Sequence, residues 1–211
     1  KVNDVIILGI DPAKSSGHAL LDSIHGKDPL RLASGVLKFS GRESYYRQIV
    51  RVLRALPAVP EHVFIESPVL YFDPDTKKPR NLIGYRTHAG ILALWIDAVY
   101  EVFKVRCEVI FPNEWQSPLF KGVYGTTKEK SRAVCVRKWG YRPDEDDEAD
   151  ALCIAFFGHT RYGFIPRFDP TDKNAGTKRA LANHIARHGG DPMMLQLLEE
   201  KEKKRNDIKL P

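Results

Sequence analysis

The stretch DEDDEADALCIAFF, residues 144–157, concentrates negative charge and then turns apolar. Six of its first seven residues are acidic, and the next seven are apolar on every face of a helix, which predicts a helix buried in the core. One carboxylate at a helix start is common, because it caps unpaired backbone N–H groups. Six carboxylates exceed that need. Asp147 and Asp150, spaced i and i+3, lie on the face that continues inward through Ile154 and Phe157.

Two carboxylates at the rim of a core repel each other, and a divalent cation between them removes the repulsion. Oxygen ligands favour Mg²⁺ or Mn²⁺ over Zn²⁺. The alternative is a solvated acidic helix start that binds no ligand. The choice depends on whether acids from elsewhere in the chain converge on Asp147 and Asp150.

Two predicted buried strands each end in an acid. Residues 5–10, VIILGI, are typical of a central strand, and Asp11 follows them before the turn-forming residues 12–17. Residues 62–65, HVFI, form a shorter strand that ends at Glu66. Four carboxylates can hold two Mg²⁺ ions about 3.5 to 4 Å apart, the arrangement that hydrolyses phosphodiesters. The predicted metal ligands and catalytic acids are Asp11, Glu66, Asp147 and Asp150.

The remaining periodicity predicts an α/β fold with a mixed five-stranded sheet flanked by helices. Further strands are predicted at 18–24, 30–39 and 107–111, and helices at 42–56, 82–103 and 126–140. The first three strands form an antiparallel meander, and residues 114–120 form a short turn. The acidic stretch starts the last helix of this domain, which is predicted to end about Gly158.

Composition divides the chain into a domain at 1–160 and an extension at 161–211. Residues 162–178 are rich in Pro, Gly, Asp and Lys, as linkers are. Two helices are predicted beyond them, at 181–188 and 192–204, which makes the extension helical and basic.

The net charge is +6 although one stretch holds six acids, so the rest of the chain is strongly basic. This pattern suits a polyanion handled at a metal site. Aromatic residues and cations alternate in the predicted loop 69–81, which suits stacking on bases and contact with phosphates, although such aromatics also pack against their own domain. The candidate DNA-binding residues here are Tyr71, Phe72, Lys77, Lys78 and Arg80, with Arg86 in the following helix.

The cysteines at 107, 135 and 153 lie in apolar segments and lack metal-ligand spacing, which predicts reduced core residues. The apolar run at 5–10 is too short to span a bilayer, so no membrane partner is expected. We therefore expect a cytoplasmic protein, of a bacterium or in the host cytoplasm if it is viral.

Four motifs, in this order, resemble RuvC, the Holliday junction resolvase of the ribonuclease-H-like fold. They are ILGIDP at 7–12, FIE at 64–66, KEKS at 128–131 and DEADAL at 147–152, and the resemblance covers about residues 5–158. It implies that the four acids bind the metal, with one active site per subunit. It also implies a homodimer that makes paired, symmetric nicks in four-way DNA junctions, in recombination, repair or viral DNA processing.

The resemblance also implies basic residues near the scissile phosphate. Lys130 matches the family's catalytic lysine best, and Lys128 is the alternative. Lys121 resembles a second basic position, and we count Lys121 and Lys128 among the candidate DNA-binding residues. A solvated helix face is the alternative for Lys121 and Lys130.

The chain departs from the family pattern at several positions. Ala13 follows Asp11-Pro12 where the family has Gly, Ser16-Gly17 replaces Thr-Gly, and Val69 stands where the family has an aromatic that opens the junction. These departures indicate a divergent branch of the family, and a viral branch is one option. They affect the residues on which cut-site sequence preference and junction selectivity depend.

Three alternatives stay open. Other ribonuclease-H-like enzymes, such as RNA:DNA hybrid nucleases and transposase cores, use the same acids. Sugar kinases and actin-like ATPases begin with a similar strand and Asp turn, but they need a second phosphate loop, which this sequence lacks. A DNA-binding module without catalysis is the third alternative.

Overall fold

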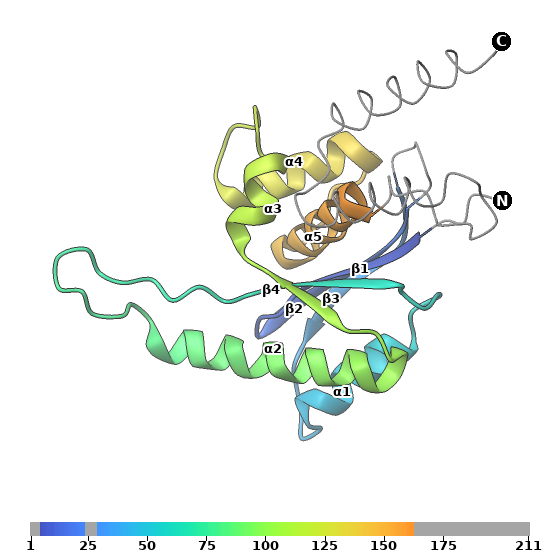
Figure 1. The fold of residues 1–211 in the computed structure, drawn as a ribbon, viewed down its shortest axis with the longest axis horizontal. Helices are drawn as coiled ribbons and strands as arrows, with labels where there is room; N and C mark the ends of the chain where they lie inside the picture. The colour runs from blue at the N-terminus through green and yellow to red at the C-terminus, as the bar shows by residue number, and fades with distance from the viewer. Residues whose placement is uncertain (1–4, 24–28, 163–211) are drawn as a thin grey trace, which may run out of the picture.

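A five-stranded sheet lies at the centre of the computed structural model, which describes residues 5–23 and 29–162 (Figure 1). The strands are β1 (Val5–Asp11), β2 (Ser15–Ser23), β3 (Leu30–Lys38), β4 (His62–Glu66) and β5 (Cys107–Ile110). Their order is β3-β2-β1-β4-β5, in which the first three are antiparallel and β4 and β5 join β1 in parallel. The predicted mixed sheet and its meander are confirmed.

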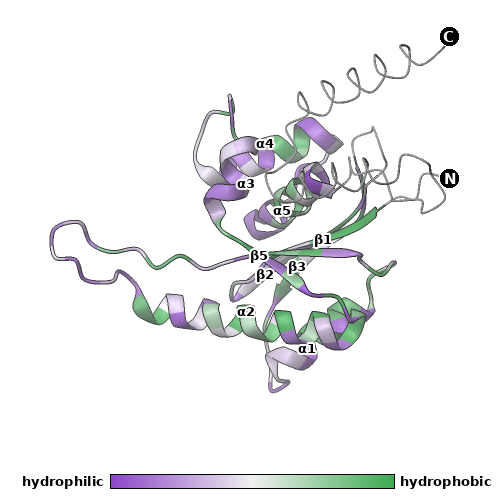
Figure 2. Ribbon diagram, in the orientation of Figure 1, coloured by the Kyte–Doolittle hydropathy of each residue, from purple (hydrophilic) through white to green (hydrophobic). Residues whose placement is uncertain are grey.

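Helices cover both faces of this sheet (Figure 1). On one face lie α1 (Tyr45–Arg54) and α2 (Leu82–Phe103), and on the other lie α3 (Pro112–Leu119), α4 (Thr127–Trp139) and α5 (Asp146–Tyr162). The predicted α/β fold with helices on both sides is therefore confirmed. The loop between β4 and α2 extends away from this body, and it is largely hydrophilic (Figure 2).

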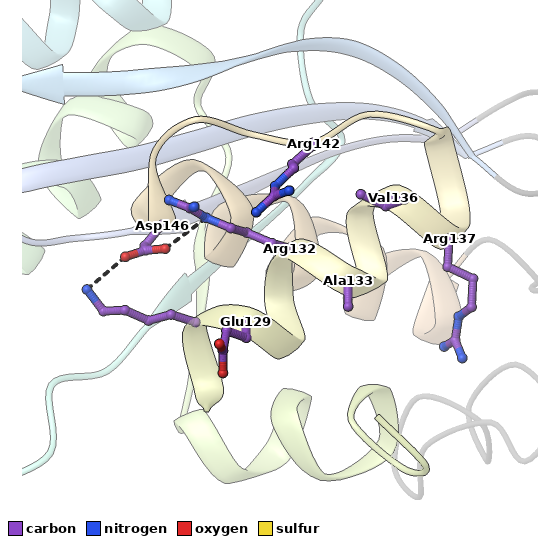
Figure 3. A pocket seen from close by; sticks show the side chains of 8 residues that line it. Glu129, Arg132, Ala133, Val136, Arg137, Arg142 and Asp146 are labelled. Atoms are coloured by element: carbon purple, nitrogen blue, oxygen red, sulfur yellow. Dashed lines mark ion pairs between the residues drawn. The ribbon is translucent and has the colours of Figure 1, made fainter. Parts of the chain in front are cut away.

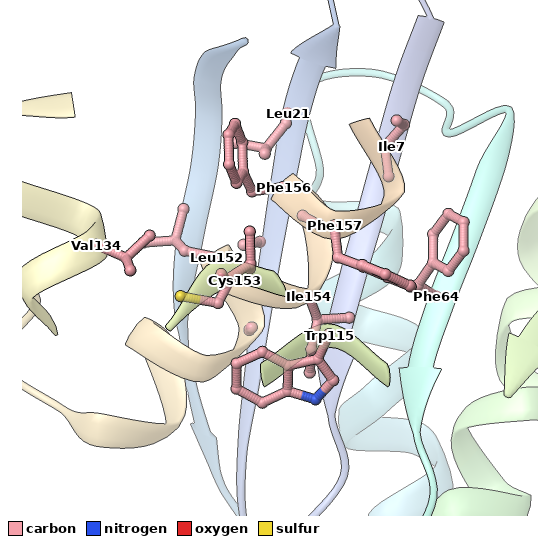
Figure 4. Packing of buried hydrophobic residues seen from close by; sticks show 14 of the residues in the cluster. Ile7, Leu21, Phe64, Trp115, Val134, Leu152, Cys153, Ile154, Phe156 and Phe157 are labelled. Atoms are coloured by element: carbon pink, nitrogen blue, oxygen red, sulfur yellow. The ribbon is translucent and has the colours of Figure 1, made fainter. Parts of the chain in front are cut away.

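Alternation along the strands divides the apolar residues between two cores. Ile7 of β1 and Phe64 of β4 face α5, whereas Leu8 and Ile65 face the opposite core with α1 and α2. Figure 4 shows the first of these cores, where the Phe64 and Phe157 rings meet edge to face with centroids 6.1 Å apart. The same alternation places the last residue of β1 and the last residue of β4 on the α5 side.

Two glycines let α5 lie against β1 and β2 at backbone distance. A Cβ at Gly9 would lie 2.4 Å from the Ala151 carbonyl oxygen, and a Cβ at Gly17 would lie 1.7 Å from the Asp147 carbonyl oxygen. Both distances are shorter than any real contact with a Cβ, so only glycine fits at either position. The first turns of α5 are thereby held against the ends of these two strands.

Several boundaries differ from those predicted. Helix α5 continues past Gly158, where a Cβ would lie 2.5 Å from the Phe64 ring, so this glycine permits close packing and does not end the helix. The predicted turn at 114–120 is helix α3, which starts at Pro112, a residue suited to a first turn. Strand β2 starts at Ser15, three residues early, because a short turn suffices to pair Asp11 with the strand.

The predicted extension lies largely outside the described residues. Its first two residues, Arg161 and Tyr162, belong to α5, and the Tyr162 ring stacks on His62 of β4 at a centroid distance of 4.0 Å. The rest of the predicted linker, the two predicted helices beyond it and the end of the second strand at Ile24 fall outside those ranges. Within the described ranges, no helix combines the length and the apolar composition that a membrane crossing requires.

Replacing Gly17 with alanine is expected to destabilise the protein by roughly 1–3 kcal/mol or more, because the added methyl group overlaps the backbone of Asp147. Urea-induced unfolding measures the change. Gly90→Ala is the matched control, since Gly90 lies in α2 with open space around its Cβ, and this variant should gain about 0.5–1 kcal/mol. Equal stability of Gly17→Ala and the wild type would contradict the close packing of α5.

Candidate active site

The carboxyl ends of β1 and β4 place two acids side by side. These neighbouring strands are parallel, and Ile10 pairs with Ile65, so Asp11 and Glu66 are the next residues at the same edge. Both side chains are partly buried, and both lie on the side of the sheet that α5 covers. The sheet register therefore fixes the first half of the site.

Helix α5 supplies the other two acids. Gly17 pairs with Asp11 across β1 and β2, and the same glycine touches the backbone of Asp147, so the start of α5 lies beside Asp11. Burial raises the pKa of Asp11 well above its usual range, and the charges of Glu66, Asp150 and Asp147 raise it further. The structure thus brings all four predicted acids within electrostatic reach of one another.

Protein donors partly satisfy two of these acids. Burial raises the pKa of Glu66 to about 7, although the Trp115 indole donates a hydrogen bond to its Oε2 at 2.5 Å, which opposes the rise. Burial raises the pKa of Asp150 to about 6, opposed by a hydrogen bond from the Ser131 hydroxyl and reinforced by the charge of Asp147. Both donors are neutral, so they stabilise the carboxylates without removing negative charge from the cluster.

A metal site is not formed by the side chains as they stand. Over residues 5–23 and 29–162, no three His, Cys, Asp or Glu side chains are grouped closely enough to hold a metal ion. Glu66 accepts a hydrogen bond from Trp115, and Asp150 accepts one from Ser131. The oxygen-only donors and the shared negative charge do fit a hard cation such as Mg²⁺ or Mn²⁺. The predicted pair of Mg²⁺ ions stays a prediction.

Lys128 is the lysine that lies beside the acids. Its Nζ is 3.0 Å from Asp146 Oδ2, and its positive charge lowers the pKa values of Asp11 and Asp150. The Nζ of Lys130 instead lies 6.0 Å from the centroid of the Phe120 ring. The geometry therefore favours Lys128, the alternative of the sequence analysis, over Lys130.

The loop between β4 and α2 carries most of the predicted DNA-binding residues. Tyr71 and Phe72 are 65% and 57% exposed, so much of each ring is open to solvent. With Arg80 they line a groove of about 500 Å³ that reaches Glu66. Asp73 stabilises the loop, because it accepts hydrogen bonds from the backbone of Thr76 at 2.9 Å and from Arg80 at 2.8 Å.

The other predicted DNA-binding residues lie on separate elements. Lys77 and Lys78 are exposed at the tip of this loop, Arg86 is exposed on α2, and Lys121 is exposed in the turn after α3. The structure places none of these four in the groove that reaches Glu66. Their DNA contacts stay predictions.

The acids of the 144–150 stretch serve different purposes. Glu148 is only 7% exposed and accepts hydrogen bonds from the hydroxyls of Ser34 at 2.6 Å and Tyr141 at 3.0 Å, so it is structural. Glu145 pairs with Lys38 at 2.5 Å. A solvated acidic helix start, the alternative to a metal site, thus describes Glu145, whereas Asp147 and Asp150 face the ends of β1 and β4.

Trp115 and Ser131, the donors to Glu66 and Asp150, were not among the predicted site residues. Ser131 ends the KEKS motif and could have been noticed there. Trp115 had no signal, because nothing in the sequence shows that a buried indole in α3 points at the end of β4.

Comparison with known proteins gives no match by sequence, since no protein-family model matches the chain and no curated protein matches it. Among solved structures, Thermus thermophilus RuvC in complex with a Holliday junction substrate is similar, with a TM-score of 0.57 and 20% identity over 72% of this chain and 91% of that chain. A second structure of Thermus thermophilus RuvC is also similar, with a TM-score of 0.53 and 22% identity over 72% of this chain and 92% of that chain. This chain has the RuvC fold.

A yeast mitochondrial Holliday junction resolvase also matches, with a TM-score of 0.47 and 13% identity over 84% of this chain and 82% of that chain. The ribonuclease-H-like fold implied by the resemblance to RuvC is thereby confirmed from the two RuvC structures. The four motifs lie on β1, β4, α4 and α5 of this fold.

In metal-free solution we expect the folded protein to lose stability as the pH rises from about 4.5 to about 7. The folded-state pKa values of Glu66 and Asp150, about 7 and about 6, exceed their usual values, so the folded state binds more protons than the unfolded state within this window. Thermal unfolding across this pH range measures the loss, and Mg²⁺ should reverse it at pH 7 by replacing the lost protons as the counter-charge.

Asp11→Asn is the control for this prediction. The variant removes one mutually repelling charge, so without Mg²⁺ at pH 7 it should melt at a higher temperature than the wild type, and it should gain less from added Mg²⁺. A melting temperature that neither Mg²⁺ nor Asp11→Asn changes would contradict a shared cation site.

Proposed function

We propose that the protein is a metal-dependent endonuclease that resolves four-way DNA junctions. The observation that carries the proposal is the meeting of Asp11, Glu66, Asp147 and Asp150 at one edge of a RuvC-like fold. One of the RuvC structures with this fold is described as a complex with a Holliday junction substrate, which supports branched DNA as the substrate. A basic chain with exposed aromatics beside the acids supports a nucleic acid as the partner.

The four acids would hold two Mg²⁺ ions, which activate a water and stabilise the leaving oxygen in phosphodiester hydrolysis. Trp115 and Ser131 each donate a hydrogen bond to one oxygen, Oε2 of Glu66 and Oδ1 of Asp150, and so orient these side chains while leaving each second oxygen available. These two bonds hold Glu66 and Asp150 at the sheet edge where Asp11 also lies.

Residues around the acids would bind the DNA itself. Lys128 lies close enough to the acids for its ammonium group to contact the scissile phosphate. Tyr71 and Phe72 offer exposed rings for stacking on unpaired bases near the junction, and Arg80 in the same groove suits a phosphate. Because symmetric nicking of a junction needs two active sites, we propose that the protein acts as a homodimer.

The wild type is expected to nick a synthetic four-way junction in the presence of Mg²⁺, at paired positions on opposite strands. Asp11→Asn should lose cleavage and keep junction binding in Ca²⁺, because it removes a metal ligand without changing the DNA-binding surface. Gel analysis of end-labelled junctions measures both. Equal cutting of linear duplex, or preference for an RNA:DNA hybrid, would reject the resolvase assignment in favour of another ribonuclease-H-like nuclease.

Exchanging the two candidate lysines tests which of them acts in catalysis. Lys128→Gln should slow single-turnover cleavage by roughly 10²- to 10³-fold, the usual effect of removing a group that stabilises developing charge, whereas Lys130→Gln should cleave almost normally. Both lysines lie on α4, so each variant controls for the other. A larger loss in Lys130→Gln would restore the assignment made from sequence.

A further inference from the structure

A second groove, which we call the α4 groove, lies on the solvent side of α4 next to the acidic site. It has a volume of about 570 Å³, and its walls are α4 and the segment that leads into α5 (Figure 3). The basic residues that line it are Lys128, Arg132, Arg137 and Arg142. Of these, the sequence analysis had singled out Lys128 alone.

One acid at the inner end of the α4 groove holds two of the cations. Asp146 lies 3.0 Å from Lys128 Nζ and 2.9 Å from Arg132 Nε (Figure 3). Arg132 also donates a hydrogen bond to the Asp144 carbonyl oxygen at 2.7 Å, which ties α4 to the start of α5. The other acid of the groove, Glu129, accepts hydrogen bonds from Thr126 as part of the α4 cap.

Two arginines of the α4 groove keep their positive charge. Arg137 and Arg142 are exposed, and neither forms an ion pair with any residue in the part of the chain that the structure describes. Charges that the protein itself leaves uncompensated along a groove are suited to binding an anion from solution.

The inner end of the α4 groove joins the acidic site. Asp146 immediately precedes Asp147, and Lys128 acts electrostatically on Asp11 and Asp150. From residue 128 to residue 137 an α-helix rises about 14 Å. One DNA strand advances about 3.4 Å per nucleotide, so this length matches about four nucleotides. A row of cations of this length suits a polymer with repeated negative charge better than a small anion.

We propose that the α4 groove binds the phosphodiester backbone of the DNA strand next to the bond that is cut. This inference rests on the proposed function for the cut itself, and it adds three arginines to the binding surface. Phosphates at the inner end would compete with Asp146 for Lys128 and Arg132. Other phosphates of the same strand would bind Arg137 and Arg142, which form no ion pair with any of the described residues.

The structure offers a matched control on the opposite side of the sheet. A groove of about 560 Å³ along α1 is also lined by arginines, among them Arg47. Two other arginines there, Arg51 and Arg54, pair with Glu43 at 2.8 Å and Glu101 at 3.8 Å. This groove has a similar size and arginine content, but it lies away from the acids.

The experiment compares Arg137→Gln/Arg142→Gln with Arg42→Gln/Arg47→Gln, two variants that each remove two exposed positive charges. Arg47 lines the α1 groove, and Arg42 lies three residues before α1 begins. Fluorescence anisotropy measures binding of a four-way junction in Ca²⁺ over a range of salt concentrations, after thermal unfolding has shown that both variants fold. The first variant should bind about tenfold more weakly, and the slope of log K against log salt should fall by about 1.8, or 0.9 per lost phosphate contact. The second variant should bind like the wild type. Equal affinities of the two variants would overturn the proposal.

Replacing single phosphodiester linkages of the DNA with uncharged ones shows where the protein contacts the backbone. A single methylphosphonate within about four nucleotides of the cut should weaken binding by the wild type but not by Arg137→Gln/Arg142→Gln. Sensitivity of the variant at those same linkages would overturn the proposal. The outcome is separable from the proposed function. If the wild type nicks junctions and Arg137→Gln/Arg142→Gln binds them with unchanged affinity, only the proposal for the α4 groove is rejected. If the wild type never nicks junctions, the proposed nuclease function is rejected, and the anisotropy comparison still decides whether the groove binds DNA.

Discussion

Helix α5 lies against β1 and β2 at a distance that Gly9 and Gly17 alone permit, and the candidate active site depends on this contact. The sheet by itself brings Asp11 and Glu66 to one edge, because β1 and β4 are parallel neighbours in register. The second pair of acids comes from a helix that begins 80 residues after Glu66 and 135 residues after Asp11. It reaches the same edge because no side chain stands between the helix backbone and the strands.

The same contact has an electrostatic cost, because it crowds carboxylates into a partly buried place. Burial and mutual repulsion raise the pKa values of Asp11, Glu66 and Asp150 above their usual range. Trp115 and Ser131 offset part of that cost with hydrogen bonds, and Lys128 offsets part with its charge. The protein thus stabilises the acids enough to fold and leaves a negative potential that suits divalent cations. Such local strain in a stable fold is typical of functional sites.

Local sequence signals gave much of the fold. The helix predicted at 82–103 matches α2 (Leu82–Phe103), because its long apolar pattern and the Asn81 cap both specify it locally. The end of α5 was predicted wrongly, because glycine often ends a helix, whereas Gly158 lies within α5 and lets the helix pack closely against the Phe64 ring. The positions of the Lys128 and Lys130 ammonium groups relative to the acids also could not be predicted, since side-chain direction on α4 depends on which face of that helix packs on α5.

The sequence by itself determined the sheet, the two acids at strand ends, the acidic pair at i and i+3 and the basic character of the rest of the chain, since periodicity, turn residues and charge are local properties. Tertiary structure alone decided which acids share one point, which donors hold Glu66 and Asp150, and that the arginines of α4 form a groove beginning at the acids. These features depend on distances between segments far apart in the chain, and such distances are set by how closely the layers pack.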